Sequence, residues 1–213
     1  SVAALMHYAR LARILGKVLG EFYRPASKYK TMTQLSESAA EIDKMLNEWQ
    51  DSLPPYLNYV VLPPSALSIM TQRHMCTLKL SYAHASLLLY RPFILYTMEA
   101  NASKISNLDE WVKKCHDKSI IAAKMVVTEC DYLYQRGLFT RAFWMVNYVQ
   151  FAAVGTLYMH SHLWPEATHI REVAEEARAQ FPVGVEGDLV GQRYVGMLDE
   201  LSKVTSSPAP MPQ

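Results

Sequence analysis

The sequence is poor in cysteine, with only Cys76, Cys115 and Cys130 in a chain of 213 residues. An odd number of widely spaced cysteines provides neither a disulfide framework nor the paired ligands of a zinc site. We therefore expect free thiols in a reducing compartment, the cytosol or the nucleus.

The sequence also lacks a surplus of charge of either sign. Its 21 lysines and arginines nearly balance its 20 aspartates and glutamates, which leaves a formal net charge of +1. A segment without a strong positive field has little attraction for a phosphate backbone. We expect no direct nucleic acid contact by this chain.

A hydrophobic run long enough for a membrane is missing. The most apolar window, residues 80–95, contains His84 and Arg91 and falls short of the roughly 20 apolar residues that span a bilayer. The opening residues, SVAALMHYARLARILG, begin in the middle of a helical pattern and lack the segments of a signal peptide. These features predict a fragment of a longer protein with no membrane span.

Motifs of catalysis and metal binding are absent as well. There is no His-Glu-x-x-His, phosphate loop, Gly-x-Ser-x-Gly elbow or paired-aspartate helix. His160 and His162 are two positions apart and point to different sides of a helix, and no Asp or Glu completes a ligand set with them and His169. We expect no enzyme, no metal site and no cofactor in this chain.

The sequence has abundant material for a core, since half of its residues are hydrophobic and 19% are charged. This composition allows enough apolar burial to offset the entropy lost on folding. Residues 1–204 are predicted to form one helical regulatory domain. The last segment, TSSPAPMPQ at 205–213, is predicted to be a disordered tail or linker.

Helical periodicity runs through the whole domain, and no strand pattern alternates. Leu5, Tyr8, Ala12, Leu15 and Leu19 form one apolar stripe on a first helix. A capping box of Thr31 and Gln34 precedes the clearest amphipathic helix. The apolar positions of that helix are Leu35, Ala39, Ile42, Leu46, Trp49 and Leu53.

Five further helices follow along the sequence. Residues 53–66, with two Pro-Pro pairs, are predicted to be a rigid connector of extended or polyproline character between the second and third helices. The later helices are expected at about 66–98, 107–136, 138–162, 165–181 and 188–204. We predict an all-α fold of about seven helices, in antiparallel pairs that form a bundle or a short α-α stack.

An Arg-Pro pair interrupts the third and most apolar helix. Pro92 has no N–H and its ring collides with the carbonyl four residues earlier, so the helix should bend or restart near 88–91. Arg91 has two interpretations. Either its guanidinium binds a carboxylate or phosphate ligand, or it satisfies the carbonyl groups that Pro92 leaves unpaired. The second, structural role is the favoured one.

Aromatic residues on the two most apolar helices are candidates for a ligand cavity. Tyr82 lies on the third helix, and Trp144 and Tyr148 lie on the helix predicted at 138–162. Aromatic side chains at such spacings more often belong to a plain core. If a small molecule binds, we expect Arg91, Tyr82, Trp144 and Tyr148 to contact it.

Four motifs in one order resemble a known family. They are EIDKMLNEWQDSLPPYL at 41–57, LKLSYAHASLLLYRPFIL at 78–95, SIIAAKMVV at 119–127 and FWMVNYVQFAAVGTLY at 143–158. Their order is similar to that in the regulatory region of fungal zinc binuclear cluster transcription factors. The resemblance covers about residues 4–162 and matches the C-terminal part of that family's middle homology region.

The resemblance implies a non-catalytic regulatory domain of a nuclear protein, or of one that moves between cytoplasm and nucleus. It implies that zinc belongs to a DNA-binding domain outside this chain. The domain would be effector-binding or autoinhibitory, and its partners would be a small-molecule effector, other regions of the same factor, co-regulators or a second copy. Two alternatives stay open: a helical interaction or dimerisation scaffold without a ligand, and a helical enzyme with a metal-binding acidic pair on facing helices.

Overall fold

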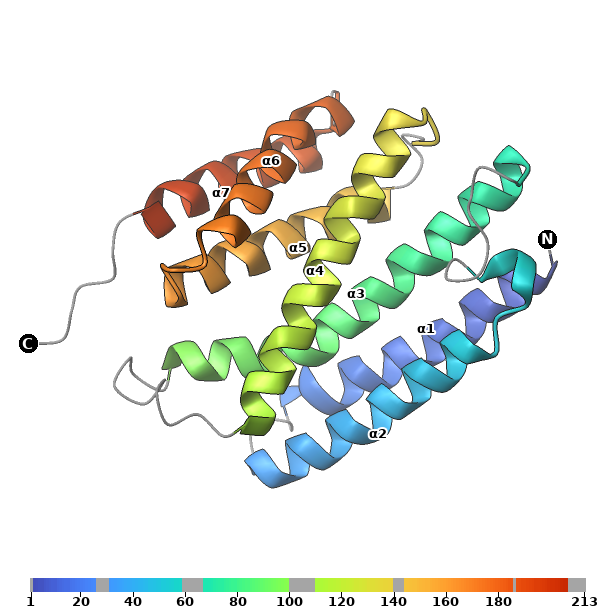
Figure 1. Ribbon diagram of the computed structural model, residues 1–213, viewed down its shortest axis with the longest axis horizontal. Helices are drawn as coiled ribbons and strands as arrows, with labels where there is room; N and C mark the ends of the chain where they lie inside the picture. The colour runs from blue at the N-terminus through green and yellow to red at the C-terminus, as the bar shows by residue number, and fades with distance from the viewer. Residues whose placement is uncertain are drawn as a thin grey trace, which may run out of the picture. The chain divides into compact units, whose positions relative to one another are not determined.

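The structure, a computed structural model, is all-α, as the periodicity predicts (Figure 1). It describes residues 2–25, 31–58, 67–99, 110–139, 144–185 and 187–206. Within these ranges there are seven α-helices and no strand. Among the described helices, none combines the length and the apolar character that crossing a membrane requires.

The helices lie close to their predicted positions. Their bounds are α1 Val2–Phe22, α2 Met32–Asp51, α3 Ile69–Glu99, α4 Glu110–Gln135, α5 Trp144–Leu163, α6 Thr168–Gly184 and α7 Leu189–Ser206. The predicted capping box is present at the start of α2: the Thr31 hydroxyl accepts from the Gln34 N–H, and the Gln34 side chain accepts from the Thr31 N–H. Residues 207–213 lie outside the described part of the chain.

The predicted start of the fifth helix is wrong. The fifth helix begins at Trp144 and not at Leu138, because Leu138 belongs to the turn that ends α4. In that turn Gly137 has a φ of +61°, and the Leu138 N–H donates back to the Leu133 carbonyl, which is a common way to satisfy the end of a helix.

The proline-rich connector is not wholly extended. Pro55–Leu57 form one 3₁₀ turn, in which the Leu57 N–H donates to the Pro54 carbonyl at 2.8 Å. The turn holds the Leu57 side chain in a fully buried position. The second Pro-Pro pair, Pro63 and Pro64, lies outside the described residues.

The chain divides into two compact units, Ser1–Pro92 and Phe93–Gln213. The boundary falls inside α3, directly after the proline. One continuous helix therefore belongs to both units. The single regulatory domain predicted for residues 1–204 stays a prediction.

In the first unit, α1 and α2 lie side by side and run antiparallel (Figure 1). An ion pair and a hydrogen bond between the two helices fix their register. The Lys17 ammonium contacts Glu41 at 2.5 Å, and the Trp49 indole donates to the His7 carbonyl at 2.9 Å. Most of the predicted apolar face of α2 is confirmed, since Ala39, Ile42, Leu46, Trp49 and Leu53 are buried, whereas Leu35 is only partly buried.

The buried face of α1 is not the predicted stripe. Leu5, Tyr8 and Leu19 are exposed. The core side of the helix consists instead of Ala4, His7, Leu11, Ile14, Val18 and Phe22. Both sides of α1 are apolar, and only packing against the neighbouring helices distinguishes them.

In the second unit, α5 packs against α4, α6 and α7 (Figure 1). The apolar character of α5 around most of its circumference follows from this central place. Val149, Ala153, Val154, Leu157 and Tyr158 are fully buried.

Two glycines of α7 allow a matched test of this packing. A Cβ at Gly191 would collide with the Val185 side chain, whereas a Cβ at Gly196 would meet nothing within 4 Å. We expect Gly191→Ala to lower the free energy of unfolding by about 1–3 kcal/mol, as overpacking does. Gly196→Ala should raise it by up to about 1 kcal/mol, because alanine favours the helix. Urea denaturation measures both, and equal effects would contradict the close approach of α7 to Val185.

Candidate functional site

The most constrained site of the first unit surrounds the missing N–H of Pro92. Helix α3 continues through the proline, so it neither ends nor restarts there. A proline inside a helix leaves the carbonyl four residues earlier, here that of Leu88, without its usual donor. The hydroxyl of Tyr23, directly after α1, donates to the Leu88 carbonyl at 2.9 Å. A side chain distant in the sequence thus replaces the lost helical hydrogen bond.

This contact corrects the role predicted for Arg91. Tyr23, and not Arg91, satisfies the carbonyl that Pro92 frees. Arg91 is partly buried, and its Nε is buried without a hydrogen-bond partner among the described residues. Burial, together with the nearby Arg91 charge, lowers the pKa of His84 to about 4. His84 is therefore neutral at pH 7, which avoids two positive charges on one face of α3, two turns apart.

Two tyrosines tie α3 to α2 around this site. The Tyr90 hydroxyl donates to the Asp43 carboxylate. Tyr82 stacks on Trp49, with ring centroids 5.9 Å apart and an interplanar angle of 16°. Burial first, and then the Asp43 charge, raise the pKa of Tyr82, so it stays a neutral hydroxyl. Both residues act as packing and hydrogen-bonding groups in the unit that contains them.

The predicted ligand contacts are divided between the units. Tyr82 and Arg91 belong to the first unit, while Tyr148 is partly buried on α5 of the second. Trp144 begins α5, and its side chain lies outside the described part of the structure. The contact of these four residues with a small molecule stays a prediction.

The second unit contains a ring cluster that the sequence did not indicate. His116 of α4 and His160 of α5 approach with their Nδ1 atoms 3.3 Å apart. Trp164 packs against both rings, at centroid distances of 4.2 Å from His116 and 5.0 Å from His160. One feature of the sequence could have indicated this cluster: His116 and Ser119 are polar residues on the otherwise apolar face of α4.

Burial controls the protonation of this cluster. Burial, and then the neighbouring His160, lower the pKa of His116 to about 4, and burial also lowers the pKa of His160. Among the described residues no group of three or more His, Cys, Asp or Glu side chains is placed to hold a metal ion. Two neutral imidazoles packed on an indole therefore make a polar core contact.

Other buried polar groups line the α4 and α5 helices. The Tyr134 hydroxyl donates to the Gln150 side chain at 3.2 Å, and burial raises the pKa values of both Tyr134 and the Cys130 thiol. A thiol with a raised pKa is protonated at neutral pH and is a poor nucleophile. The described contacts give this thiol the properties of a core residue.

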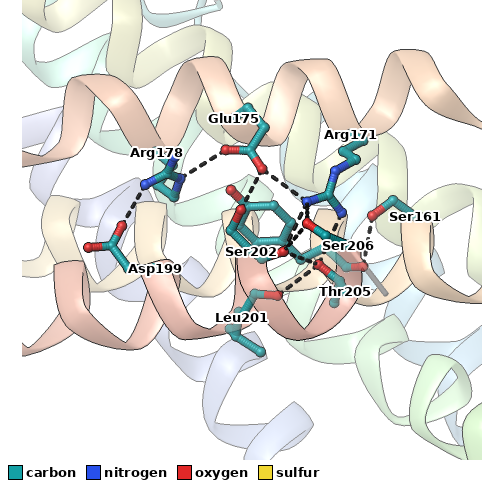
Figure 2. A network of polar contacts seen from close by, with 10 residues as sticks. Ser161, Arg171, Glu175, Arg178, Asp199, Leu201, Ser202, Thr205 and Ser206 are labelled. Carbon is teal, nitrogen blue, oxygen red and sulfur yellow. Dashed lines mark hydrogen bonds and ion pairs between the residues drawn. The ribbon is translucent and has the colours of Figure 1, made fainter. Parts of the chain in front are cut away.

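An ion-pair and hydrogen-bond network joins α6 to α7 (Figure 2). Glu175 accepts from the Arg178 guanidinium at 2.9 Å and from the Ser202 hydroxyl at 2.6 Å, and Arg178 also contacts Asp199 at 2.5 Å. Burial raises the pKa of Glu175, but hydrogen bonds from Ser202 and Arg178 outweigh it, so the pKa falls below its ordinary value. The charges satisfy one another, which gives the network a structural role.

Arg171 completes this network at the end of α7. Its guanidinium donates to the Ser202 carbonyl at 3.0 Å and to the hydroxyls of Thr205 and Ser206 at 3.1 and 2.6 Å. The Ser202 carbonyl also accepts from the Ser206 hydroxyl at 2.6 Å. Arg171 therefore links α6 to the C-terminal end of α7 through several groups at once (Figure 2).

Comparison with known proteins gives one informative similarity. The chain is similar to Activator of stress genes 1 of Saccharomyces cerevisiae, at 26% identity over an alignment that covers 94% of this chain. The chain spans about a fifth of the length of that relative, since the alignment covers 21% of the yeast protein. No family model and no solved structure matches the chain.

The contact between Tyr23 and Leu88 can be tested with a double-mutant cycle. We expect Tyr23→Phe to lower the free energy of unfolding by about 1 kcal/mol, because it removes a hydrogen bond to a carbonyl that has no helical donor. In a Pro92→Ala background the same change should cost much less, since the N–H of the alanine can bond to Leu88. Urea denaturation measures the four free energies. An equal cost in both backgrounds would contradict the assignment, and Tyr56→Phe at an exposed tyrosine is the control.

The His116 cluster predicts a pH dependence of stability. The pKa of His116 is lowered from 6.5 to about 4 on folding, so between these values the unfolded chain binds more protons than the folded chain. Stability should therefore fall as the pH drops from 6.5 towards 4, by up to about 3 kcal/mol from this residue.

Thermal melting of His116→Gln against wild type over this range isolates the contribution. The charged and titratable groups around the pair, Asp117, Lys124, Glu166 and His169, are unchanged in both proteins. The variant should show a shallower pH slope, whatever its stability at pH 7. His162→Gln on the same helix is the control, and parallel slopes for wild type and His116→Gln would rule out the assignment.

Proposed function

We propose that this chain is a non-catalytic regulatory segment of a fungal transcription factor, whose DNA-binding zinc cluster lies outside it. The observation that supports this most strongly is the similarity to Activator of stress genes 1 along nearly the whole chain. The name of that relative describes an activator of genes. The order of the four motifs, which resembles the fungal family, is a second and separate argument.

The chemistry of the described residues is compatible with regulation. The titratable groups in the interior are held neutral or satisfied by partners, as with His84, His116 and Glu175. Groups in this state hold helices in place and do not activate a substrate. A helical segment of this kind acts by shifting the balance between arrangements of the longer protein when an effector or a partner favours one of them.

A chimera tests the proposal. The aligned region of Activator of stress genes 1 is replaced by residues 1–213 of this chain in yeast. We expect stress-dependent induction of a reporter gene under its control to be retained, because the inserted segment supplies the same regulatory structure. Deletion of the region should abolish that response, either as lost or as constant activity.

The matched control is a chimera that carries Leu87→Pro. This change breaks α3 at a fully buried position, so the control should behave like the deletion. A chimera that responds no better than one with an unrelated helical domain of similar size would refute the proposal.

The finer proposal is that the segment binds a small effector or masks another part of the factor. A ligand that binds the folded state raises the melting temperature in a saturable manner. The melting temperatures of the purified chain and of its Arg91→Ala and Tyr82→Ala variants are measured with a set of small molecules. This distinguishes effector binding from masking, because an effector would stabilise the wild type more than the variants. No response to any compound would favour masking or an interaction scaffold.

A further inference from the structure

The Arg171 guanidinium of α6 contacts two hydroxyls at the C-terminal end of α7 (Figure 2). It donates to the Thr205 hydroxyl at 3.1 Å and to the Ser206 hydroxyl at 2.6 Å. Phosphorylation of a hydroxyl adds negative charge and three strong acceptor oxygens, which a guanidinium binds with its fork of N–H donors. A phosphate on one of these hydroxyls would therefore meet an arginine that is already in place.

The hydroxyls near Arg171 differ in their exposure and in their other contacts. Ser202 is partly buried and donates to Glu175 at 2.6 Å, so a phosphate there would meet a carboxylate. Thr205 is also partly buried, and its hydroxyl donates to the Leu201 carbonyl at 2.7 Å. Ser206 alone of the three is exposed, and it is the last residue of α7. It therefore combines accessibility with a direct contact to the guanidinium.

The position of Ser206 suits the active site of a protein kinase. The last turn of a helix frays readily, so little structure has to open before the serine can enter such a site. Lys203 lies three residues before Ser206 and is exposed. Many protein kinases bind a basic side chain at this spacing in an acidic groove, which is one of the charge patterns by which they select substrates. The ion pair of Lys203 with Glu200 is itself exposed and is therefore weak.

Two opposing effects decide whether the phosphate is stabilised after it has been added. The negative end of the helix dipole at the end of α7 disfavours a phosphate. Arg171 favours it through charge-assisted hydrogen bonds. If Arg171 turns from Glu175 to the phosphate, Glu175 keeps the Arg178 guanidinium at 2.9 Å and the Ser202 hydroxyl at 2.6 Å. The network can therefore accept the new charge without leaving its own carboxylate unpaired.

We propose that Ser206 is a phosphorylation site whose phosphate binds Arg171 and ties the end of α7 to α6. The phosphoryl donor is ATP, bound to a separate protein kinase. The Ser206 Oγ forms a bond to the γ-phosphorus while the bond from that phosphorus to the β,γ-bridging oxygen breaks. ADP leaves, and the hydroxyl proton passes to a carboxylate of the kinase. This inference is independent of the role in transcription.

The first experiment locates the phosphate. The 213-residue chain is purified from yeast, and a second sample is incubated with ATP and the cyclic-AMP-dependent protein kinase, which prefers basic residues before its serine. Trypsin cuts after Lys203 and releases residues 204–213 for mass spectrometry. We expect the phosphate on Ser206 and its loss in Ser206→Ala. A chain with no phosphate on Ser206 from either source, or with phosphate on Ser207 alone, would overturn the proposal.

The second experiment measures the contact between the phosphate and Arg171. Phosphoserine is incorporated genetically at position 206 or, as a matched control, at position 52. Ser52 is also exposed at the C-terminal end of a helix, and its hydroxyl donates to the Trp49 carbonyl at 2.7 Å. Among the described residues, no arginine or lysine forms a hydrogen bond with that hydroxyl.

Phosphorus NMR gives the second pKa of each phosphate, which is about 6 for a phosphate without such a contact. We expect this pKa to be about half a unit lower at Ser206 than at Ser52, because a nearby positive charge favours the dianion. The phosphate on Ser206 should also raise the melting temperature by about 2 °C. The phosphate on Ser52 should lower the melting temperature, since it meets the helix dipole without a counter-charge.

Variants of Arg171 make the test specific. Arg171→Gln should remove both the pKa difference and the gain in melting temperature. Arg171→Lys should keep part of each, because lysine supplies the charge without the fork of donors. Each variant is compared with its own unphosphorylated form, so a change in its basal stability does not affect the result. The control Arg193→Gln, at an exposed arginine of α7, should leave both effects unchanged.

Three results would contradict the binding of the phosphate by Arg171. They are equal pKa values at Ser206 and Ser52, a pKa at Ser206 that neither Arg171 variant changes, and a melting temperature that falls when Ser206 is phosphorylated. In the last case, the helix dipole would outweigh the guanidinium, and phosphorylation would loosen the end of α7.

Discussion

The hydrogen bond that Pro92 cannot make is the constraint around which the first unit is organised. The carbonyl of Leu88 needs a donor, because a buried acceptor without one costs about 1–3 kcal/mol. Helix α3 cannot supply the donor itself, and water has little access to a residue as buried as Leu88. Tyr23 supplies it from the end of α1, so the sequence of α3 and the position of α1 depend on each other.

The same principle extends to the other helices. Several buried or half-buried polar groups find a partner on a different element, as Tyr90 does with Asp43 and Arg171 does with the Ser202 carbonyl of α7. Hydrogen bonds of this kind contribute little net stability individually, yet an unsatisfied alternative is costly. Their main effect is therefore to select one register of each helix pair, because other registers would leave these groups unsatisfied. Their direct contribution to stability is small.

The protonation states of the interior titratable groups favour a structural role for these groups. Burial keeps His84 and His116 neutral and the Cys130 thiol protonated, while hydrogen bonds from Ser202 and Arg178 favour the charged form of Glu175. None of these shifts pairs an acid with a base at a shared reacting position. The apolar side chains of Val2, Leu5 and Leu19 on α1 differ from these interior groups, since they are exposed to solvent.

The sequence by itself determined the all-α class, the positions of most helices, the capping box of Thr31 and Gln34 and the buried face of α2. These features depend on residues within a few turns of one another, where spacing decides which side chains share a face. Tertiary structure alone decided that Tyr23 satisfies Leu88, a contact between positions 65 residues apart, and that His116 meets His160. It also decided which of two apolar faces of α1 is buried. Both faces have helical periodicity, so the choice depended on the shape and the hydrogen-bonding groups of α2 and α3.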